Sequence, residues 1–541
     1  MGTPDRRRRW RLGVVAAFAV AASSALPAGS AVVNLSLTTS PYIVMGPDAT
    51  TVHNAVNLLT GRRAVVSDLP LVNGVLANLT TADLGLLPTS YVTSPDAQVL
   101  TAMAAGKPGP KPPPTPPPYN NVFRQVTGAT DPSVGTNTGQ GVAVAVVDTG
   151  ISPMPDFGTR LKPGVDLSGE KNAQLDSFGH GTFIAGLIAG NGASSNHVIV
   201  GEAPGADLVP VKVAGKSGST SVSKVIQGLQ WIKDNPGNIG VINMSLGAIP
   251  PGPTVFNPLD QAVEAMWNAG FVVVTSAGNN GDQLGTVTSP GDDPLVITVG
   301  ALDDKGTVDP ATDEVPTFSS RGPTSSDGWW KPDLLAPGKS VGSVMSNRSV
   351  IWNSYPTARI GNANFVGSGT SFSAAITSGA VALLLASHDR SPSAVKAALI
   401  TTTNPGPGAV HSPFEQGHGV LNIAKAIAEP QIDMQQLIGI APLPVGSTID
   451  LLTTKLASGW ASVDSSELLP LSPLPFSGPA TTANDGGLPL PTPFFHDSVW
   501  NAAEWDSHAW NDGTWDSHAW NDTQWNSHAW NSHAWNSAMW N

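Results

Sequence analysis

The sequence of 541 residues contains no cysteine, which excludes disulfides, a cysteine-ligated metal and a cysteine nucleophile. Charged residues are also scarce, at 12% of the chain against roughly 25% in typical soluble domains. The formal net charge is −13, and the only tight basic cluster, Arg6 to Arg9 with Arg11, lies at the very start. An acidic chain without a later basic patch repels nucleic acid, so we expect no nucleic-acid partner.

Long hydrophobic runs are missing after the first thirty residues, so we expect no transmembrane segment in the mature chain. The run LGVVAAFAVAA (residues 12–22) follows the arginine cluster and precedes small residues, but it is shorter than the ~20 apolar residues of a spanning helix. This pattern is typical of a secretory signal peptide, which we place at residues 1–31. The mature protein is therefore expected to be secreted, and to be extracellular or associated with the cell surface.

The rest of the chain divides into segments of different composition. Residues 32–103 alternate strand-like and helix-like stretches, with a helix start at Thr80. A proline-rich linker at residues 104–118 marks a domain boundary. After the large segment 119–428 come a low-complexity connector at residues 429–499 and a tail at residues 500–541, in which tryptophan recurs at every fifth position.

The large segment alternates apolar runs with stretches of helical character. The runs are VAVAVV, VIVG, LVPVKV, IGVINM, FVVVTS and LVITVG. Apolar runs without alternation are typical of strands buried on both faces, as in a parallel sheet covered by helices. The sequence therefore predicts an α/β fold of three layers with a mostly parallel central sheet, preceded by a small α+β unit at residues 32–103.

Three polar residues of this segment have the chemistry of a serine hydrolase. Asp148 ends the run VAVAVV, at the carboxyl end of a predicted strand, where open α/β sheets build their sites. His180 lies between two glycines at the start of an apolar helix, and Ser371 directly precedes another apolar helix. A serine that attacks a carbonyl needs a base for its proton and a carboxylate that orients the base. Each residue alone would be read as a turn residue, a structural histidine or a helix cap, but together they predict a triad.

Asn279 follows the run FVVVTS and adds a fourth group. Its side-chain amide can donate a hydrogen bond to the oxyanion that develops in acyl transfer, together with the backbone N–H of Ser371. The tripeptide D-T-G that begins at Asp148 also occurs in aspartic proteases. A single-chain enzyme of that class needs a second D-[ST]-G for its carboxylate pair, and the sequence has none.

In chain order, D-T-G, G-H-G-T-x-x-A-G, S-A-G-N and G-T-S-x-[SA]-[AM] resemble the signatures of the subtilase family of serine peptidases. The resemblance covers the segment 119–428 and implies a subtilisin-like fold. It implies that Asp148, His180 and Ser371 are catalytic and that Asn279 belongs to the oxyanion hole. It also implies that six residues bind the substrate as an extended strand: Ser245, Leu246, Gly247, Ser276, Ala277 and Gly278.

The resemblance further implies that residues 32–103 are an inhibitory propeptide and that no cofactor is required. Members of the family often bind structural calcium, but no ligand for it, and no metal site, can be assigned from this sequence. Two features depart from the family pattern. Ala375 replaces a common proline four residues after Ser371, and an insertion, SNRSVIWNSYPTARIGNANF (residues 346–365), lengthens the interval before Ser371 and is a candidate for reshaping the cleft wall.

The expected function is that of a secreted serine endopeptidase that acts on protein or peptide substrates through an acyl-enzyme, with its own propeptide as intramolecular inhibitor. The alternative is a surface-associated, self-processing protein whose tryptophan-repeat tail mediates binding, for example to a cell wall or a glycan. A tail of low complexity without a fold of its own is an equal interpretation of residues 500–541.

Overall fold

The computed structural model describes residues 38–100, 119, 121–408 and 412–429. The predicted signal peptide, the proline-rich linker, the connector beyond residue 429 and the tryptophan tail lie outside the described residues, so these predictions stay untested.

The larger unit is built on a seven-stranded sheet in which every neighbouring pair of strands is parallel. In the order β13-β12-β11-β10-β6-β8-β7, the strands are β13 (Leu334–Pro337), β12 (Ile297–Leu302), β11 (Val272–Ser276), β10 (Ile239–Met244), β6 (Ala143–Asp148), β8 (Asp207–Lys212) and β7 (Val165–Asp166). Every residue of β6, β11 and β12 is buried. This confirms the interpretation of their uninterrupted apolar runs as strands covered on both faces.

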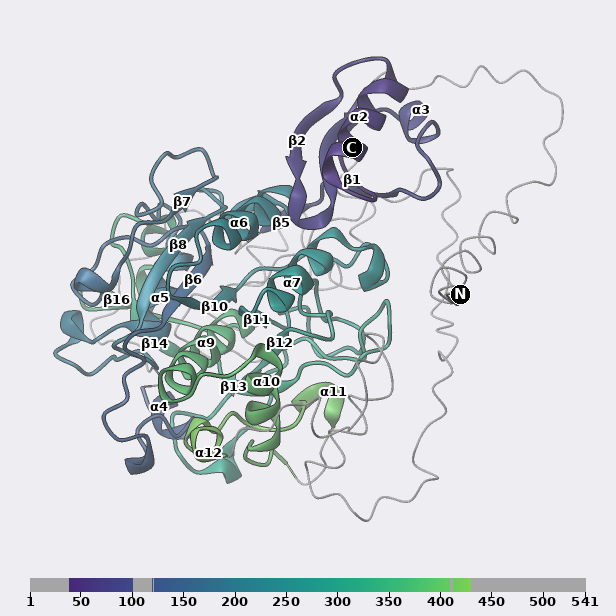
Figure 1. The fold of residues 1–541 in the computed structure, drawn as a ribbon. Helices are drawn as coiled ribbons and strands as arrows, with labels where there is room; N and C mark the ends of the chain where they lie inside the picture. Colours follow the sequence, from purple (N-terminus) through teal and green to yellow (C-terminus); the bar gives the residue numbers. More distant parts are fainter. Residues whose placement is uncertain (1–37, 101–118, 120, 409–411, 430–541) are drawn as a thin grey trace, which may run out of the picture.

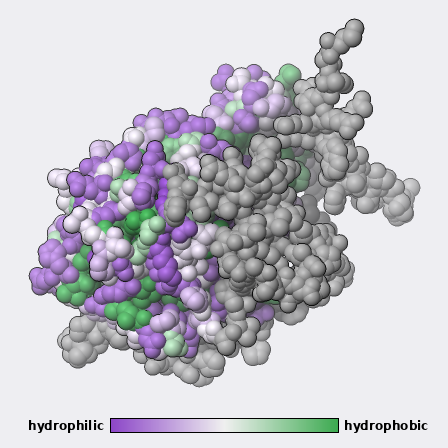
Figure 2. Space-filling model, turned by 60° about the horizontal axis from the view of Figure 1, so that its bottom comes forward, coloured by the Kyte–Doolittle hydropathy of each residue, from purple (hydrophilic) through white to green (hydrophobic). Residues whose placement is uncertain are grey.

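Two pairs of long helices cover this sheet, which gives the predicted three-layer α/β fold (Figure 1). In one pair α5 (His180–Ala189) packs against α9 (Thr370–Ser387), and in the other α6 (Val222–Asp234) packs against α7 (Pro258–Asn268). Among the described residues, α9 alone is long and apolar enough to cross a membrane, but most of it is buried in the core. Hydrophilic residues cover most of the described surface on the face shown in Figure 2.

One apolar run was predicted wrongly. The run VIVG (residues 198–201) is not a strand, and Val198 is exposed. The chain here terminates α5 instead, because Gly201 N donates to Gly190 O at 2.7 Å and Glu202 N donates to Leu187 O at 2.8 Å. The last carbonyls of a helix need such donors, and this segment provides them rather than joining the sheet.

The N-terminal unit is an antiparallel sheet of four strands with two helices, as the α+β prediction requires. Its strands are β1 (Ser40–Met45), β2 (Val65–Leu69), β3 (Gly74–Leu79) and β4 (Val92–Pro95), and its helices are α2 (Ala49–Thr60) and α3 (Thr81–Leu84). The predicted helix start at Thr80 is confirmed by a reciprocal capping box with Asp83. Figure 1 shows this unit beside α6 and α7.

The insertion of residues 346–365 folds beside α5. It contains α8 (Val350–Ser354) and β15 (Arg359–Ile360), and its end enters β16 (Asn364–Gly367). These strands form a small antiparallel sheet with β14 (Val341–Val344) in the order β14-β16-β15. β14 packs against α5, where Ser343 Oγ donates to Phe183 O at 2.8 Å.

Candidate active site

The three predicted catalytic residues lie at the ends of three elements of the central unit. Asp148 is the last residue of β6, His180 is the first residue of α5, and Ser371 is the second residue of α9. All three side chains are fully buried. Gly179, which precedes His180, has a φ of 115°. Residues with a side chain rarely adopt this backbone conformation, so glycine is needed where the chain turns into α5.

Asp148 and His180 are in direct contact. His180 Nδ1 lies 2.9 Å from Asp148 Oδ1 and 2.8 Å from Oδ2. An ionised carboxylate only accepts hydrogen bonds, so this contact assigns the proton of the neutral imidazole to Nδ1. Nε2 is then the basic nitrogen of the ring. Thr149 N donates to Asp148 Oδ1 at 2.7 Å and holds the carboxylate in this orientation.

Helix packing brings Ser371 to the same place. The ring of Phe372, the residue after Ser371, lies 6.1 Å from the ring of His180 and 4.6 Å from that of Phe183, which fixes α9 against α5. The Ser371 hydroxyl lies 3.4 Å from Ser245 O. Asp148 and His180 are therefore in contact at the carboxyl end of β6, and Ser371 lies at the start of the helix that packs against the His180 ring.

Asn279 lies just after β11, and its orientation is fixed by Thr370. Asn279 Oδ1 accepts hydrogen bonds from Thr370 N and from Thr370 Oγ1, both at 2.9 Å. A backbone N–H can only donate, so the atom facing Thr370 is the amide oxygen and the amide nitrogen points to the other side. No pattern in the sequence indicates this role for Thr370, whose position in G-T-S predicts only the start of a helix.

If Asn279 belongs to the predicted oxyanion hole, replacing it with Ala is expected to lower kcat by about 10²- to 10³-fold with little change in KM, because an oxyanion donor acts on the transition state rather than on the bound substrate. That magnitude is the one found for the corresponding type of donor in subtilisin. Steady-state kinetics on a chromogenic peptide measures it. An equal loss confined to KM would contradict the oxyanion role.

Two of the six residues predicted to bind substrate contact the start of α9. Ser245 Oγ donates to Ser371 O at 2.8 Å, and Gly278 N donates to Thr370 Oγ1 at 3.2 Å. A Cβ atom added to Gly247 would lie 2.7 Å from Thr288 Oγ1, and one added to Gly278 would lie 3.0 Å from the same atom. The segments 245–247 and 276–278 therefore converge on Thr288, a buried residue that sequence reasoning missed.

A second feature that the sequence did not predict is β9 (Ser219–Ser221), which pairs antiparallel with β5 (Gln98–Leu100) of the N-terminal segment. Val99 lies opposite Thr220 in this ladder and is buried. Next to it, the Asp96 carboxylate accepts from Ser223 N at 2.8 Å and from Ser223 Oγ at 2.7 Å, at the start of α6. No local pattern signals this pairing, because the two strands are far apart in the sequence.

Within the described residues, no group of three or more histidine or carboxylate side chains has an arrangement suited to a metal ion. Calcium is also bound by backbone carbonyls, so the calcium expectation stays untested.

Three buried carboxyl groups and the half-buried Glu264 form a cluster next to the segment 288–291. Asp260 and Glu264 come from α7, and Asp292 and Asp293 precede β12. Both carboxyl oxygens of Asp292 are buried without a hydrogen-bond partner in the described part of the chain. Burial and then the charge of Asp293 raise the pKa of Asp292 to about 8, and the same two causes raise the pKa of Glu264 to about 7. Like charges that share a buried site cannot all ionise.

This cluster predicts that the protein loses stability at alkaline pH. A carboxyl whose pKa is raised by folding stabilises the folded state below its unfolded pKa of about 4, and this contribution is lost as pH rises through the folded value, here about 8. In Asp292→Asn, the asparagine has nearly the shape of a protonated aspartate but cannot ionise. In thermal unfolding of a Ser371→Ala background, the fall in Tm between pH 5 and pH 9 is expected to be smaller with Asp292→Asn than without it. An unchanged fall would contradict the assignment.

The parallel sheet, with an aspartate, a histidine and a serine brought together at its carboxyl edge, defines an α/β protein with a serine-hydrolase type of site. The chain belongs to the subtilase family, whose family model matches residues 139–419.

The similar proteins carry names of that family. The chain is 44% identical over 277 residues to serine protease AprX of Bacillus subtilis (strain 168), a match that covers 50% of this chain and 62% of AprX. It is 37% identical over 248 residues to subtilisin Savinase of Lederbergia lenta, covering 46% of this chain and 77% of that protein. The crystal structure of fervidolysin from Fervidobacterium pennivorans, a keratinolytic enzyme related to subtilisin, has the same fold with a TM-score of 0.56 at 24% identity, over 73% of this chain and 62% of that chain.

Proposed function

We propose that this protein is a secreted serine endopeptidase in which Ser371 attacks the peptide carbonyl, His180 acts as general base and Asp148 orients His180. The observation that carries this proposal is the contact of both Asp148 carboxylate oxygens with His180 Nδ1, at 2.8 and 2.9 Å, beside the start of the helix that holds Ser371. Membership of a family of serine peptidases supports it.

In the proposed reaction, His180 Nε2 takes the hydroxyl proton as Ser371 Oγ bonds to the carbonyl carbon. The carbonyl π electrons move to oxygen, and the oxyanion accepts hydrogen bonds from the Asn279 amide and from the backbone N–H of Ser371. The Asp148 carboxylate stabilises the imidazolium without taking its proton. As the C–N bond breaks, His180 gives its proton to the leaving amine and an acyl-enzyme remains. Water, deprotonated by His180, then attacks the ester carbonyl, and His180 returns the proton to Ser371 Oγ as the C–O bond breaks and the carboxylic acid product is released.

The proposed substrate is an extended protein or peptide segment that binds as an additional strand. Antiparallel pairing of β5 with β9 supports this, because β9 accepts an extended strand along this edge. The segments 245–247 and 276–278, which meet near Thr288, supply the opposite walls.

We also propose that the N-terminal unit is an intramolecular inhibitor. Its segment β5 occupies the strand edge that a substrate would use, and Asp96 binds the start of α6. Its apolar residues Leu69, Leu71 and Val72 belong to the same core cluster as residues of α6 and α7. These contacts support the proposal, because they hold a folded unit next to the strand edge that the substrate would use.

The test compares the full-length protein with its Ser371→Ala variant. The parent is expected to shorten during secretion and to cleave casein, whereas the variant is expected to keep its full length and to leave casein intact. If both proteins mature alike and neither cuts a substrate, the peptidase proposal is wrong.

A further inference from the structure

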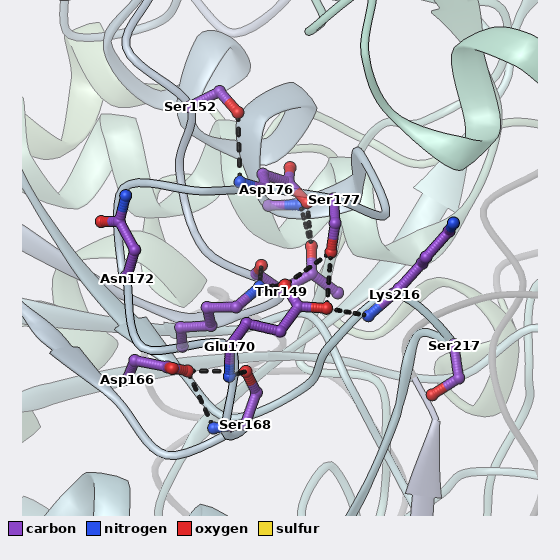
Figure 3. Close-up of polar contacts among 12 residues, drawn as sticks. Thr149, Ser152, Asp166, Ser168, Glu170, Asn172, Asp176, Ser177, Lys216 and Ser217 are labelled. Atoms are coloured by element: carbon purple, nitrogen blue, oxygen red, sulfur yellow. Dashed lines mark hydrogen bonds and ion pairs between the residues drawn. The ribbon is translucent and has the colours of Figure 1, made fainter.

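Glu170, in the loop after β7, joins three segments of the chain (Figure 3). Its carboxylate accepts from Ser177 Oγ at 2.9 Å through Oε1 and at 2.6 Å through Oε2. Oε1 also accepts from Lys216 N at 2.8 Å, and Oε2 lies 3.1 Å from Lys212 Nζ. One side chain thus contacts the turn before His180, the end of β8 and the loop that leads to β9.

Lys212 gives this junction its charge. It ends β8, directly opposite Asp148 in the sheet, and its ammonium group is buried and donates to Thr149 O. The carboxylates of Asp166 and Asp176 are near enough for the Lys212 charge to act on them too. Partial burial opposes ionisation of Glu170, but the bonds from Ser177 and the Lys212 charge outweigh it and lower the pKa of Glu170. Glu170 is therefore an anion at neutral pH.

The first consequence concerns His180. Ser177 lies three residues before it, in a turn whose ends are fixed: Asp176 Oδ1 accepts from Gly179 N at 2.6 Å, and Asp176 Oδ2 accepts from Thr182 N at 2.7 Å. The insertion holds the turn from another side, because Val350 N donates to Ser177 O at 2.9 Å. Glu170 adds the bond to the Ser177 side chain, so the start of α5 is held by contacts from three directions.

The second consequence concerns β9. Lys216 is the second residue of the turn 215–218, in which Gly218 N donates to Gly215 O at 2.9 Å. β9 follows this turn directly, and Ser217 Oγ contacts Ser219 Oγ at 2.7 Å. The two turns also touch each other, since a Cβ atom added to Gly218 would lie 2.7 Å from the Phe178 ring. The loop that leads to β9 is therefore connected to the turn before His180 both by packing and through Glu170.

On these contacts, and resting on the proposed peptidase function, we propose that Glu170 is a positioning residue that couples strand pairing on β9 to the placement of His180. A peptide long enough to pair with β9 restricts the motion of the loop that contains Lys216. Through its hydrogen bonds, Glu170 then also restricts the motion of Ser177 and the start of α5. Lengthening the substrate then raises kcat as well as lowering KM.

The kinetic test uses the mature enzyme with two substrates that share one cleaved residue: a single-residue ester and a peptide with four residues before the cleaved bond. The ratio of kcat for the long substrate to kcat for the short one is expected to fall about fivefold or more in Glu170→Gln. Ser177→Ala, which leaves the Glu170 and Lys212 pair intact, is expected to lower the ratio in the same direction. Glu314→Gln, which alters a mostly exposed ion pair with Lys305, is the control with an unchanged ratio.

An unchanged ratio in Glu170→Gln, or an equal fall of kcat for both substrates, would overturn the coupling. Amide hydrogen exchange of the Ser371→Ala precursor, in which β5 pairs with β9, provides a readout that needs no activity. Adding Glu170→Gln is expected to speed exchange in residues 177–182 and in residues 217–221 together, and faster exchange in one segment only, or in neither, contradicts the coupling. A parent enzyme that cleaves nothing overturns the proposed function instead.

Discussion

Replacement of His180 with Ala is expected to lower kcat by about 10⁶-fold, the loss found when the histidine of the subtilisin triad is removed. Without the imidazole, the proposed reaction has no base for the Ser371 hydroxyl. The hydroxyl contacts the carbonyl of Ser245 at 3.4 Å, but a peptide carbonyl does not act as a base for a hydroxyl proton. Asp148→Asn is expected to cost about 10⁴-fold, because an amide facing Nδ1 no longer fixes the tautomer with a basic Nε2.

These losses are measured on purified mature protein with a chromogenic peptide. To avoid dependence on self-processing, the variants are produced with the N-terminal unit supplied as a separate chain. His388→Ala, a change of an exposed histidine whose ring contacts Ile427 O, serves as the control and is expected to keep full activity. A decrease in kcat of less than tenfold in His180→Ala would contradict the role of His180 as the general base.

Replacement of Lys396 with Met is expected to lower the free energy of unfolding by about 3–5 kcal/mol. The carboxylate of Asp333 is buried between two ammonium groups, Lys331 Nζ at 2.8 Å and Lys396 Nζ at 3.0 Å. Burial lowers the pKa of Lys331 to about 8, against the attraction of Asp333. Methionine at position 396 removes one of the two ammonium groups that contact the buried Asp333 carboxylate. It also removes the hydrogen-bond donor to Pro294 O, which Lys396 Nζ contacts at 2.7 Å.

Urea unfolding at pH 7 in the Ser371→Ala background measures this change. Lys233→Met, at an exposed position of α6, is the matched control and is expected to alter stability by less than about 0.5 kcal/mol. If Lys396→Met and Lys233→Met cost the same, the buried charges of Lys331, Asp333 and Lys396 do not stabilise the fold.

The strands and the order of the catalytic residues could be predicted from the sequence because their signals are local. A run such as VAVAVV is typical of a strand inside a sheet that is covered on both faces. Asp148, at the end of this run, then lies at the edge of the sheet where functional sites form. The run VIVG shows the limit of this reasoning. It is as apolar as the strands, but its backbone forms a hydrogen bond with the end of α5 instead of with the sheet.

The contacts that complete the site join residues that are distant in sequence. Thr370 orients Asn279, β5 pairs with β9, and Glu170 meets Lys216, and none of these pairs leaves a periodic or compositional signal. The insertion is a further example. Its sequence indicates only an added loop, whereas in the structure Val350 N donates a hydrogen bond to the turn before His180. Such contacts depend on how the elements pack, which a single sequence does not specify.

The most direct test of the central claim is labelling of the mature protein with a fluorophosphonate, which reacts with a serine only where a base activates it. Mass spectrometry is expected to find the adduct on Ser371 in the parent, and no adduct in His180→Ala or in Ser371→Ala. An adduct on another serine, or undiminished labelling of Ser371 in His180→Ala, would contradict the proposed triad.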